Sequence, residues 1–95
     1  MTLDELLERV RSDAAPAVRI DSRRIGEGDV FVAIRGAGCD GHAFISQAIA
    51  AGAGYVVHAR DWSIPESLRS TDGLRFIPVP HPARVAGLLA QAANR

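Results

Sequence analysis

The stretch Val30–His58 decides the fold, and it reads VFVAIRGAGCDGHAFISQAIAAGAGYVVH. It opens with the apolar run Val30–Ile34, which is typical of a strand buried on both faces in a sheet that helices cover on two sides. A helix is expected over His42–Ala51, because its apolar residues recur at helical spacing, and Gly52 can end it in a left-handed cap. A second strand follows over Tyr55–His58. A strand, a helix and a strand in this order predict a parallel pair joined by a right-handed crossover.

The segments on either side alternate in the same way. Helices are expected over Thr2–Arg11 and Pro82–Ala93, with one further helical turn at Glu66–Arg69, and strands over Ala17–Ile20 and Leu74–Val79. Thr2 and Glu5 have the spacing of a capping box, and Pro78 places the last strand at an edge or an end of the sheet. This alternation predicts an α/β fold: a small layered domain with a mixed, mostly parallel sheet of about four to five strands and helices on both faces.

Length and composition indicate one small globular domain over residues 1–95. Of the 95 residues, 47% are apolar and 23% charged, which suits a packed core. The 11 basic residues are all arginines and balance 11 acidic residues, so net charge does not favour binding to nucleic acid. No apolar run approaches the roughly 20 residues of a membrane span, and the acidic N-terminus does not resemble a signal peptide. With a single cysteine and no internal disulfide, a cytoplasmic location is expected.

The first candidate for binding is Asp21-Ser22-Arg23, which follows an expected strand. In parallel α/β sheets, ligands lie beyond the carboxyl ends of the strands. Ser22 could donate a hydrogen bond to a ligand oxygen while Asp21 holds the loop. The alternative is a local turn without a ligand, because Asp and Ser are common turn formers.

The second candidate is the glycine loop Arg35–Gly41, which leads into the expected helix. Glycines allow a ligand to approach the backbone closely, and the free N–H groups at a helix start favour a pyrophosphate. The spacing matches neither a Walker loop nor the dinucleotide-binding pattern. A turn in which Asp40 caps the helix explains the loop equally well.

Metal binding and catalysis receive little support. Cys39, Asp40 and His42 are residue types that ligate metals, but no Cys-x-x-Cys or His-x-x-x-His pair completes a four-ligand site, so no metal site is expected. A catalytic pair of Cys39 and His42 is not expected either, because the two need not face each other at a helix start. We therefore expect no catalytic residue in this chain.

Several other side chains have two interpretations each. Arg23, Arg24 and Arg35 could hold a phosphate as bidentate donors, or lie at the surface as solvated charges. Trp62 and Tyr55 could stack on a base or pack against the protein. The residues alone therefore predict a small α/β domain whose loops at the strand ends either bind an anionic ligand or only form turns.

Several segments together resemble the N-terminal domain of Mur ligases, of the MurE type. The matching segments are Ile20–Ile25 (IDSRRI), Gly28–Ile34 (GDVFVAI), Gly36, Asp40–His42, Phe44–Ile45, Gly52–Ala53 with Tyr55–Val57, and Val79–Pro80 with Arg84. The resemblance extends over residues 18–93 and leaves out the first helix. It implies the fold of the first domain of MurE and MurF ligases.

The resemblance implies binding of the uridine diphosphate part of UDP-N-acetylmuramoyl-L-alanyl-D-glutamate. The implied contact residues are Ile20, Ser22, Ala37, Gly38 and Cys39, with Asp21, Arg23, Asp40 and His42 as a possible second layer. Because Ala37, Gly38 and Cys39 offer few polar side-chain groups, contacts from this loop would come largely from the backbone. The domain would serve a ligase that adds the third amino acid of the peptidoglycan stem peptide.

ATP and Mg²⁺ are implied for the complete ligase, on a separate domain. This chain has no lysine, and therefore no Gly-x-x-x-x-Gly-Lys-Ser/Thr motif. The ATP-binding and C-terminal domains are thus expected outside residues 1–95, with no cofactor inside them. The expected partners are the UDP-linked dipeptide and the remaining ligase domains, and the chain alone is not expected to be active.

Three alternatives stay open. A MurF-type ligase, which adds a dipeptide to the tripeptide substrate, has a similar first domain. The sequence Asp21-Ser22-Arg23, rather than Asp-Thr-Arg, favours the MurE type. A free-standing nucleotide-binding module would need no ligase domains, and a purely structural protein would use every glycine for a turn and bind no nucleotide.

Overall fold

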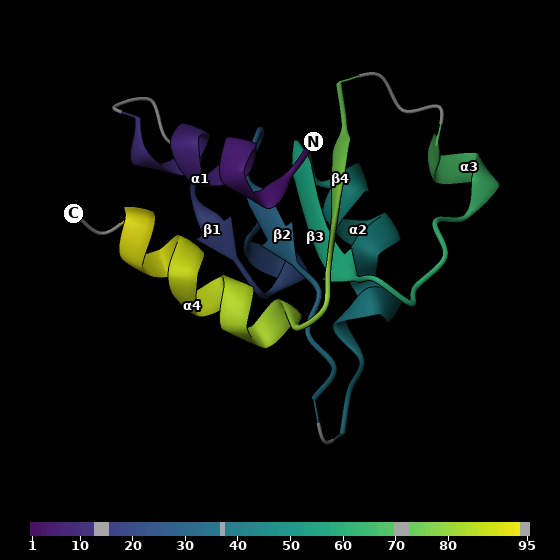
Figure 1. Ribbon diagram of the computed structural model, residues 1–95. Coiled ribbons are helices and arrows are strands. Elements are labelled where there is room, and N and C mark those ends of the chain that lie inside the picture. The colour runs from purple at the N-terminus through teal and green to yellow at the C-terminus, as the bar shows by residue number, and fades with distance from the viewer. Residues whose placement is uncertain (13–15, 37, 70–72, 94–95) are drawn as a thin grey trace.

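The computed structural model describes residues 1–12, 16–36, 38–69 and 73–93, and within these it shows a small α/β domain (Figure 1). The helices are α1 (Leu3–Arg11), α2 (Ile45–Ala50), α3 (Glu66–Arg69) and α4 (Pro82–Ala93), with 3₁₀-helical turns η1 (Ser22–Arg24) and η2 (Gly41–Phe44). The strands are β1 (Val18–Arg19), β2 (Val30–Val32), β3 (Tyr55–Ala59) and β4 (Arg75–Val79). No helix in the described part of the chain is long and apolar enough to cross a membrane.

The strands form one parallel sheet in the order β1-β2-β3-β4. The expected mostly parallel sheet is therefore confirmed, and its four described strands all run in one direction. The register places Val30 opposite Val18 on one side and opposite Tyr55 on the other. Because the strands are parallel, the loops that follow β1, β2 and β3 gather at the carboxyl end of the sheet.

Both faces of the sheet pack against helices, as the apolar runs of β2 and β3 predict (Figure 1). On one face, Val30 and Val32 pack with α1 and α4, which lie side by side and bury Leu6 and Leu89. On the other face, Phe31 packs with the buried residues of α2. Side chains alternate along a strand, so β2 serves two separate hydrophobic clusters.

Local signals account for the elements near both ends of the chain. Oγ1 of Thr2 accepts the Glu5 N–H at 3.3 Å, and the Glu5 carboxylate accepts the Thr2 N–H at 3.2 Å, so the expected capping box begins α1. Helix α4 has the bounds that its apolar stripe predicts. Pro78 lies in β4 at the edge of the sheet, where a strand tolerates a residue without an N–H.

The helix expected over His42–Ala51 begins differently. Residues Gly41–Phe44 form the 3₁₀-helical turn η2, and the regular helix α2 starts only after it. The tight start follows from Asp40, whose carboxylate accepts the His42 N–H at 2.9 Å and caps the turn. Gly52 ends the helix with a φ of +112°, in the left-handed region expected there.

Candidate functional site

A pocket of about 450 Å³ lies beyond the carboxyl ends of β1 and β2, and we call it the strand-end pocket. It is lined by Ile20–Arg23 after β1, by Ile34, Gly36 and Cys39 after β2, and by Gly41, Phe44 and Gln47 at the start of the following helix. Ile20 is 63% exposed and Phe44 is 39% exposed, so two large apolar side chains face solvent at one pocket. A concave apolar surface with a few polar groups is typical of a small-molecule site.

Three of the residues predicted to contact a ligand, Ile20, Ser22 and Cys39, line the strand-end pocket. Gly38 belongs to the same loop as Cys39 but is not among the lining residues. Ala37 lies outside the described part of the chain. The fold thus brings together the two predicted segments, because they follow neighbouring parallel strands.

Asp21 and Arg23 also line the pocket, and they form the turn after β1. The Asp21 carboxylate accepts the Arg23 N–H at 3.0 Å and pairs with its guanidinium through hydrogen bonds of 3.0 and 2.9 Å. The Arg23 side chain, followed by its backbone N–H, lowers the pKa of the Asp21 carboxyl to about 2. The turn that Asp and Ser predict is therefore present, at the rim of the pocket.

Ser22 connects this turn to α2. Its side chain is buried, and Oγ donates to Oε1 of Gln47 at 3.3 Å. Gln47 lines the strand-end pocket, and its amide can offer a donor as well as an acceptor to a ligand. Gln47 was not predicted from the sequence, because nothing in its own segment distinguishes it from any exposed polar residue on a helix.

The glycine loop projects from the body of the molecule beyond β2 (Figure 1). The Gly36 N–H donates to the Cys39 carbonyl, and the Gly41 N–H donates to the Ile34 carbonyl, both at 2.8 Å. A Cβ at Gly41 would lie only 2.7 Å from the backbone nitrogen of Ile34. Glycine is therefore required at the base of the loop, where two backbone segments approach each other closely.

Asp40 occupies the helix start that the glycine loop offered for a pyrophosphate. Its carboxylate caps η2, and hydrogen bonds from the backbone and then the ring of His42 lower its pKa below the usual range. A second anion would be repelled by this charge. The structure favours Asp40 as a helix cap over a phosphate site at this position.

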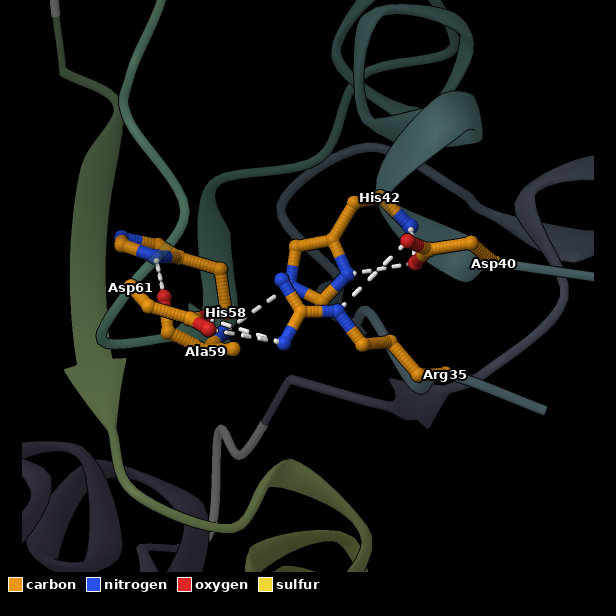
Figure 2. Close-up of polar contacts among 6 residues, drawn as sticks. All are labelled: Arg35, Asp40, His42, His58, Ala59 and Asp61. Atoms are coloured by element: carbon orange, nitrogen blue, oxygen red, sulfur yellow. Dashed lines mark hydrogen bonds and ion pairs between the residues drawn. The ribbon is translucent and has the colours of Figure 1, made fainter.

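His42 is buried behind the glycine loop and links it to the sheet, as Figure 2 shows. Nδ1 of His42 lies 2.7 Å from Oδ1 of Asp40, and Nε2 accepts the Ala59 N–H at 2.9 Å. Arg35 adds a second link between the glycine loop and the chain that follows β3, because its Nη1 lies 3.0 Å from an Asp61 carboxylate oxygen. Two side chains from the loop region therefore reach the carboxyl end of β3.

The two links differ in strength. Arg35 and Asp61 are 48% and 72% exposed, and an exposed ion pair contributes at most about 1 kcal/mol. The bond between His42 and Ala59 is buried, and a buried N–H that loses its acceptor costs about 1–3 kcal/mol. The His42 link therefore dominates. From the sequence, His42 was considered as a metal ligand, as a base, and as part of a second layer around the nucleotide. Its bond to β3 was not predicted, although its position two residues after a helix-capping Asp was the available signal.

A second pocket, of about 400 Å³, lies on the other side of the glycine loop and shares Ile34 with the strand-end pocket. Arg35 and His42 line it, together with residues at the ends of β3 and β4. None of the direct contacts implied by the resemblance is among its described lining residues, although it includes Arg35, considered for phosphate binding, and His42, considered for the second layer. The strand-end pocket is therefore the better candidate site.

The arginines considered for phosphate binding already pair with carboxylates. Arg23 and Arg24 lie 2.9 and 3.9 Å from Asp21, and Arg35 lies 3.6 Å from Asp40 besides its contact with Asp61. All three side chains are 48% to 78% exposed. The structure favours their interpretation as surface charges.

The two large aromatic side chains with polar tips pack against the protein. The Trp62 ring lies 5.0 Å from the His58 ring and 5.7 Å from the His42 ring, between centroids. The Tyr55 hydroxyl accepts a hydrogen bond from Arg9 at 3.2 Å. Neither Trp62 nor Tyr55 is among the residues described as lining the strand-end pocket, so the packing interpretation is correct for both.

The part of the chain that the structure describes contains no group of three or more His, Cys, Asp or Glu residues placed to hold a metal ion. Cys39 is exposed on the glycine loop. Both ring nitrogens of His42 are engaged, by Asp40 and by Ala59. His42 is therefore not poised to activate the Cys39 thiol as a general base.

His58 makes stability depend on pH. Burial lowers its pKa below 6.5, and within the described residues its Nε2 has no hydrogen-bond partner. Because the folded pKa is lowered, the folded chain binds fewer protons than the unfolded chain. The stabilisation from neutral His58 is complete above pH 6.5 and is lost as the pH falls from 6.5 towards the folded pKa.

We expect His58→Phe to remove the pH-dependent contribution of His58 to the free energy of unfolding, because phenylalanine fills the space between Trp62 and Phe76 without titrating. Urea unfolding of both proteins at pH 7.5, 6.5 and 5.5 measures this contribution. One titrating group changes the free energy of unfolding by at most about 1.4 kcal/mol per pH unit. The wild-type chain should lose more stability than the variant over this range. Equal losses in the two proteins would contradict the prediction.

Residues 16–94 match the family described as Mur ligase family, catalytic domain. Among curated proteins, the chain is 38% identical over 74 residues to a UDP-N-acetylmuramoyl-L-alanyl-D-glutamate–2,6-diaminopimelate ligase from Cytophaga hutchinsonii, an alignment that covers 78% of this chain and 14% of that protein. It is 40% identical over 72 residues to a UDP-N-acetylmuramoyl-tripeptide–D-alanyl-D-alanine ligase from Mycobacterium bovis, covering 76% of this chain and 13% of that protein.

Among solved structures, the chain resembles the MurF ligase from Thermotoga maritima in complex with ADP. The TM-score is 0.64 and the sequence identity 28%, and the match covers 92% of this chain and 17% of that one. The chain spans only 13% to 17% of the length of these three proteins. The relatives include ligases for two different steps, one with a dipeptide and one with a tripeptide in its name.

Proposed function

The chain belongs to the Mur ligase family, and from this premise we propose that its strand-end pocket binds the uridine diphosphate part of a UDP-N-acetylmuramoyl peptide. The observation that carries the proposal is the meeting of Ile20, Ser22 and Cys39 in one pocket, although they come from loops after two different strands. The names of the two similar ligases from Cytophaga hutchinsonii and Mycobacterium bovis contain the UDP-N-acetylmuramoyl group.

The chemistry of the pocket suits a nucleotide. A nucleobase has a flat apolar face and a polar edge. Ile20 and Phe44 offer exposed apolar surface to the face, and the linked side chains of Ser22 and Gln47 offer a hydroxyl and an amide to the edge. The backbone at Gly36 and Cys39 would run along the nucleotide, since these residues line the pocket from the loop side.

In this proposal the chain is one domain of an ATP-dependent amide-forming ligase of peptidoglycan synthesis, acting in the cytoplasm. Its own residues do not fit ATP and Mg²⁺: the sequence has no lysine for a phosphate-binding loop, and its described residues gather no metal-ligand set. Those groups would be bound by other domains of the ligase, and we assign no catalytic residue to this chain.

The step within the pathway is a narrower proposal. Ser22 in Asp21-Ser22-Arg23 supports a MurE-type enzyme, which adds the third amino acid to UDP-N-acetylmuramoyl-L-alanyl-D-glutamate. The likeness to a MurF structure and to D-alanyl-D-alanine ligases supports the alternative. Assaying the ligase that contains this domain with the dipeptide substrate plus single amino acids, and with the tripeptide substrate plus D-alanyl-D-alanine, decides between them.

An amide NMR titration tests the nucleotide site directly. With UDP at up to millimolar concentration, we expect saturable shifts confined to residues 20–23, 34, 36 and 38–47, which include the described residues that line the strand-end pocket. Affinity should be weak, because most substrate contacts would lie on other domains. UMP serves as the control for the second phosphate. Shifts centred elsewhere, or none in these segments, would refute the assignment of the pocket.

The reactivity of the Cys39 thiol provides an independent measure of UDP binding at the strand-end pocket. It is the only cysteine in the chain, it is exposed, and it lines the strand-end pocket. Bound UDP should therefore slow alkylation of its thiol by iodoacetamide, with half-protection at the UDP concentration that half-saturates the NMR shifts. An alkylation rate independent of UDP would count against a ligand lying along the loop.

A further inference from the structure

The hydrogen bonds of His42 determine its protonation. A backbone N–H can only donate, so Nε2, which faces the Ala59 N–H at 2.9 Å, must be the unprotonated acceptor. The ring proton of a neutral histidine then lies on Nδ1, which is 2.7 Å from the Asp40 carboxylate. The contacts on both sides of the ring select the neutral Nδ1–H tautomer (Figure 2).

The imidazole continues the hydrogen bonding of the sheet where β2 has ended. The pairing of β2 with β3 ends at Val32 and Val57, although the Ala33 N–H still donates to the Val57 carbonyl. The Ala59 N–H lies two residues further along β3 and is buried. His42 supplies the acceptor there, 17 positions away in sequence.

The same ring holds the glycine loop from behind. Asp40 receives both the backbone N–H and Nδ1–H of His42, and it follows directly on Cys39, which lines the strand-end pocket. In Figure 2 the His42 ring lies between Asp40 and Ala59, and Arg35 extends past it to Asp61. The loop is therefore tied to β3 chiefly through one buried side chain.

We propose that His42 is a positioning residue for the strand-end pocket: through Asp40 and Ala59, its neutral imidazole holds the glycine loop in the conformation that forms one wall of the site. His42 does not line that pocket, so it acts on the ligand only through the loop. The identity of the ligand as UDP rests on the proposed function, whereas the tie between loop and sheet does not.

The central experiment compares His42→Phe with His58→Phe. Both histidines are buried and both rings contact Trp62, but among the described residues His58 hydrogen-bonds only to the adjacent Ala59 carbonyl. We expect His42→Phe to weaken UDP binding about tenfold, the size of effect typical of losing a buried hydrogen-bond acceptor. His58→Phe should leave UDP affinity within about twofold. Even where this change lowers the stability of the fold, it removes no hydrogen bond to the described part of the glycine loop.

A conservative variant and the wild-type chain make the test independent of how well His42→Phe folds. The Oε1 atom of His42→Gln can replace Nε2 as acceptor, so this variant should recover part of the lost affinity. In the wild-type chain, ¹⁵N NMR of the His42 ring should show a protonated Nδ1 and an unprotonated Nε2. Amide exchange at Gly36 and Gly41, whose N–H groups close the loop, should speed up in His42→Phe and not in His58→Phe.

Each outcome decides the inference. Equal losses of UDP affinity in the two phenylalanine variants, or a proton on Nε2 of wild-type His42, would overturn it. If the wild-type chain does not bind UDP, the proposed function fails, and the role of His42 is decided by amide exchange alone. Faster exchange at Gly36 and Gly41 in His42→Phe then supports the tie, and unchanged exchange refutes it.

Discussion

Replacing Gly41 with alanine is expected to open the base of the glycine loop and to weaken UDP binding about tenfold or more, the equivalent of about 1–3 kcal/mol of overpacking. The new Cβ would lie 2.7 Å from the nitrogen and 2.9 Å from the oxygen of Ile34. These are backbone atoms, so no side chain can rotate away to make room. Relief requires that the loop separate from the end of β2, where Ile34 forms part of the strand-end pocket.

Gly38→Ala is the matched control for this change. It is the same substitution in the same loop, but a Cβ at Gly38 meets no atom of the described residues within 4 Å. The resemblance implied a contact at Gly38, but the structure does not place Gly38 among the residues that line the strand-end pocket. This control should bind UDP as the wild-type chain does, and lower unfolded-state entropy should stabilise it by about 0.4–1 kcal/mol. UDP titration and urea unfolding measure both effects. Similar UDP affinities for the two variants would show that the loop base does not shape the pocket.

Replacing Phe31 with alanine is expected to cost about 3–5 kcal/mol of unfolding free energy. Phe31 is fully buried in the middle of β2 and anchors the hydrophobic cluster beneath α2. Native domains are stable by only about 5–15 kcal/mol, and short chains tend towards the lower end. We therefore expect the variant to be partly unfolded near 37 °C, as measured by circular dichroism and urea titration.

Phe44→Ala separates packing from binding. Phe44 carries the same side chain but is 39% exposed and lines the strand-end pocket. Its loss should cost no more than about 1 kcal/mol of stability, and it should weaken UDP binding because an apolar contact to the base disappears. If Phe31→Ala and Phe44→Ala lost equal stability, the assignment of Phe31 in β2 to the buried core and of Phe44 in η2 to the exposed pocket would be wrong.

The elements that sequence analysis predicted correctly depend on local or periodic signals. The apolar run beginning at Val30 became a strand buried on both faces. Thr2 and Glu5 formed their capping box, and α4 runs from Pro82 as its apolar stripe predicts. These features depend on neighbours within a few positions, so a single sequence contains the information that determines them.

The candidate site was predicted in part. Polar and glycine residues that follow strands indicate the carboxyl end of the sheet as the place of a site, but they do not indicate which contacts are made there. Ile20, Ser22 and Cys39 were identified through the resemblance to Mur ligases, and the structure places them at one pocket. Asp40 was equally compatible with a pyrophosphate site and with a cap until its bonds to His42 were seen. The sequence alone could not decide between these, since both readings need the same residues.

The sequence by itself determined the α/β class, the alternation of helices and strands, and the segments that carry the candidate site. Only the tertiary structure decided which distant groups meet. Ser22 reaches Gln47 across 25 positions, and His42 reaches the Ala59 N–H across 17. Such partners are set by the register of parallel strands and by the path of the chain between them, and a residue's own neighbours in sequence place no constraint on either.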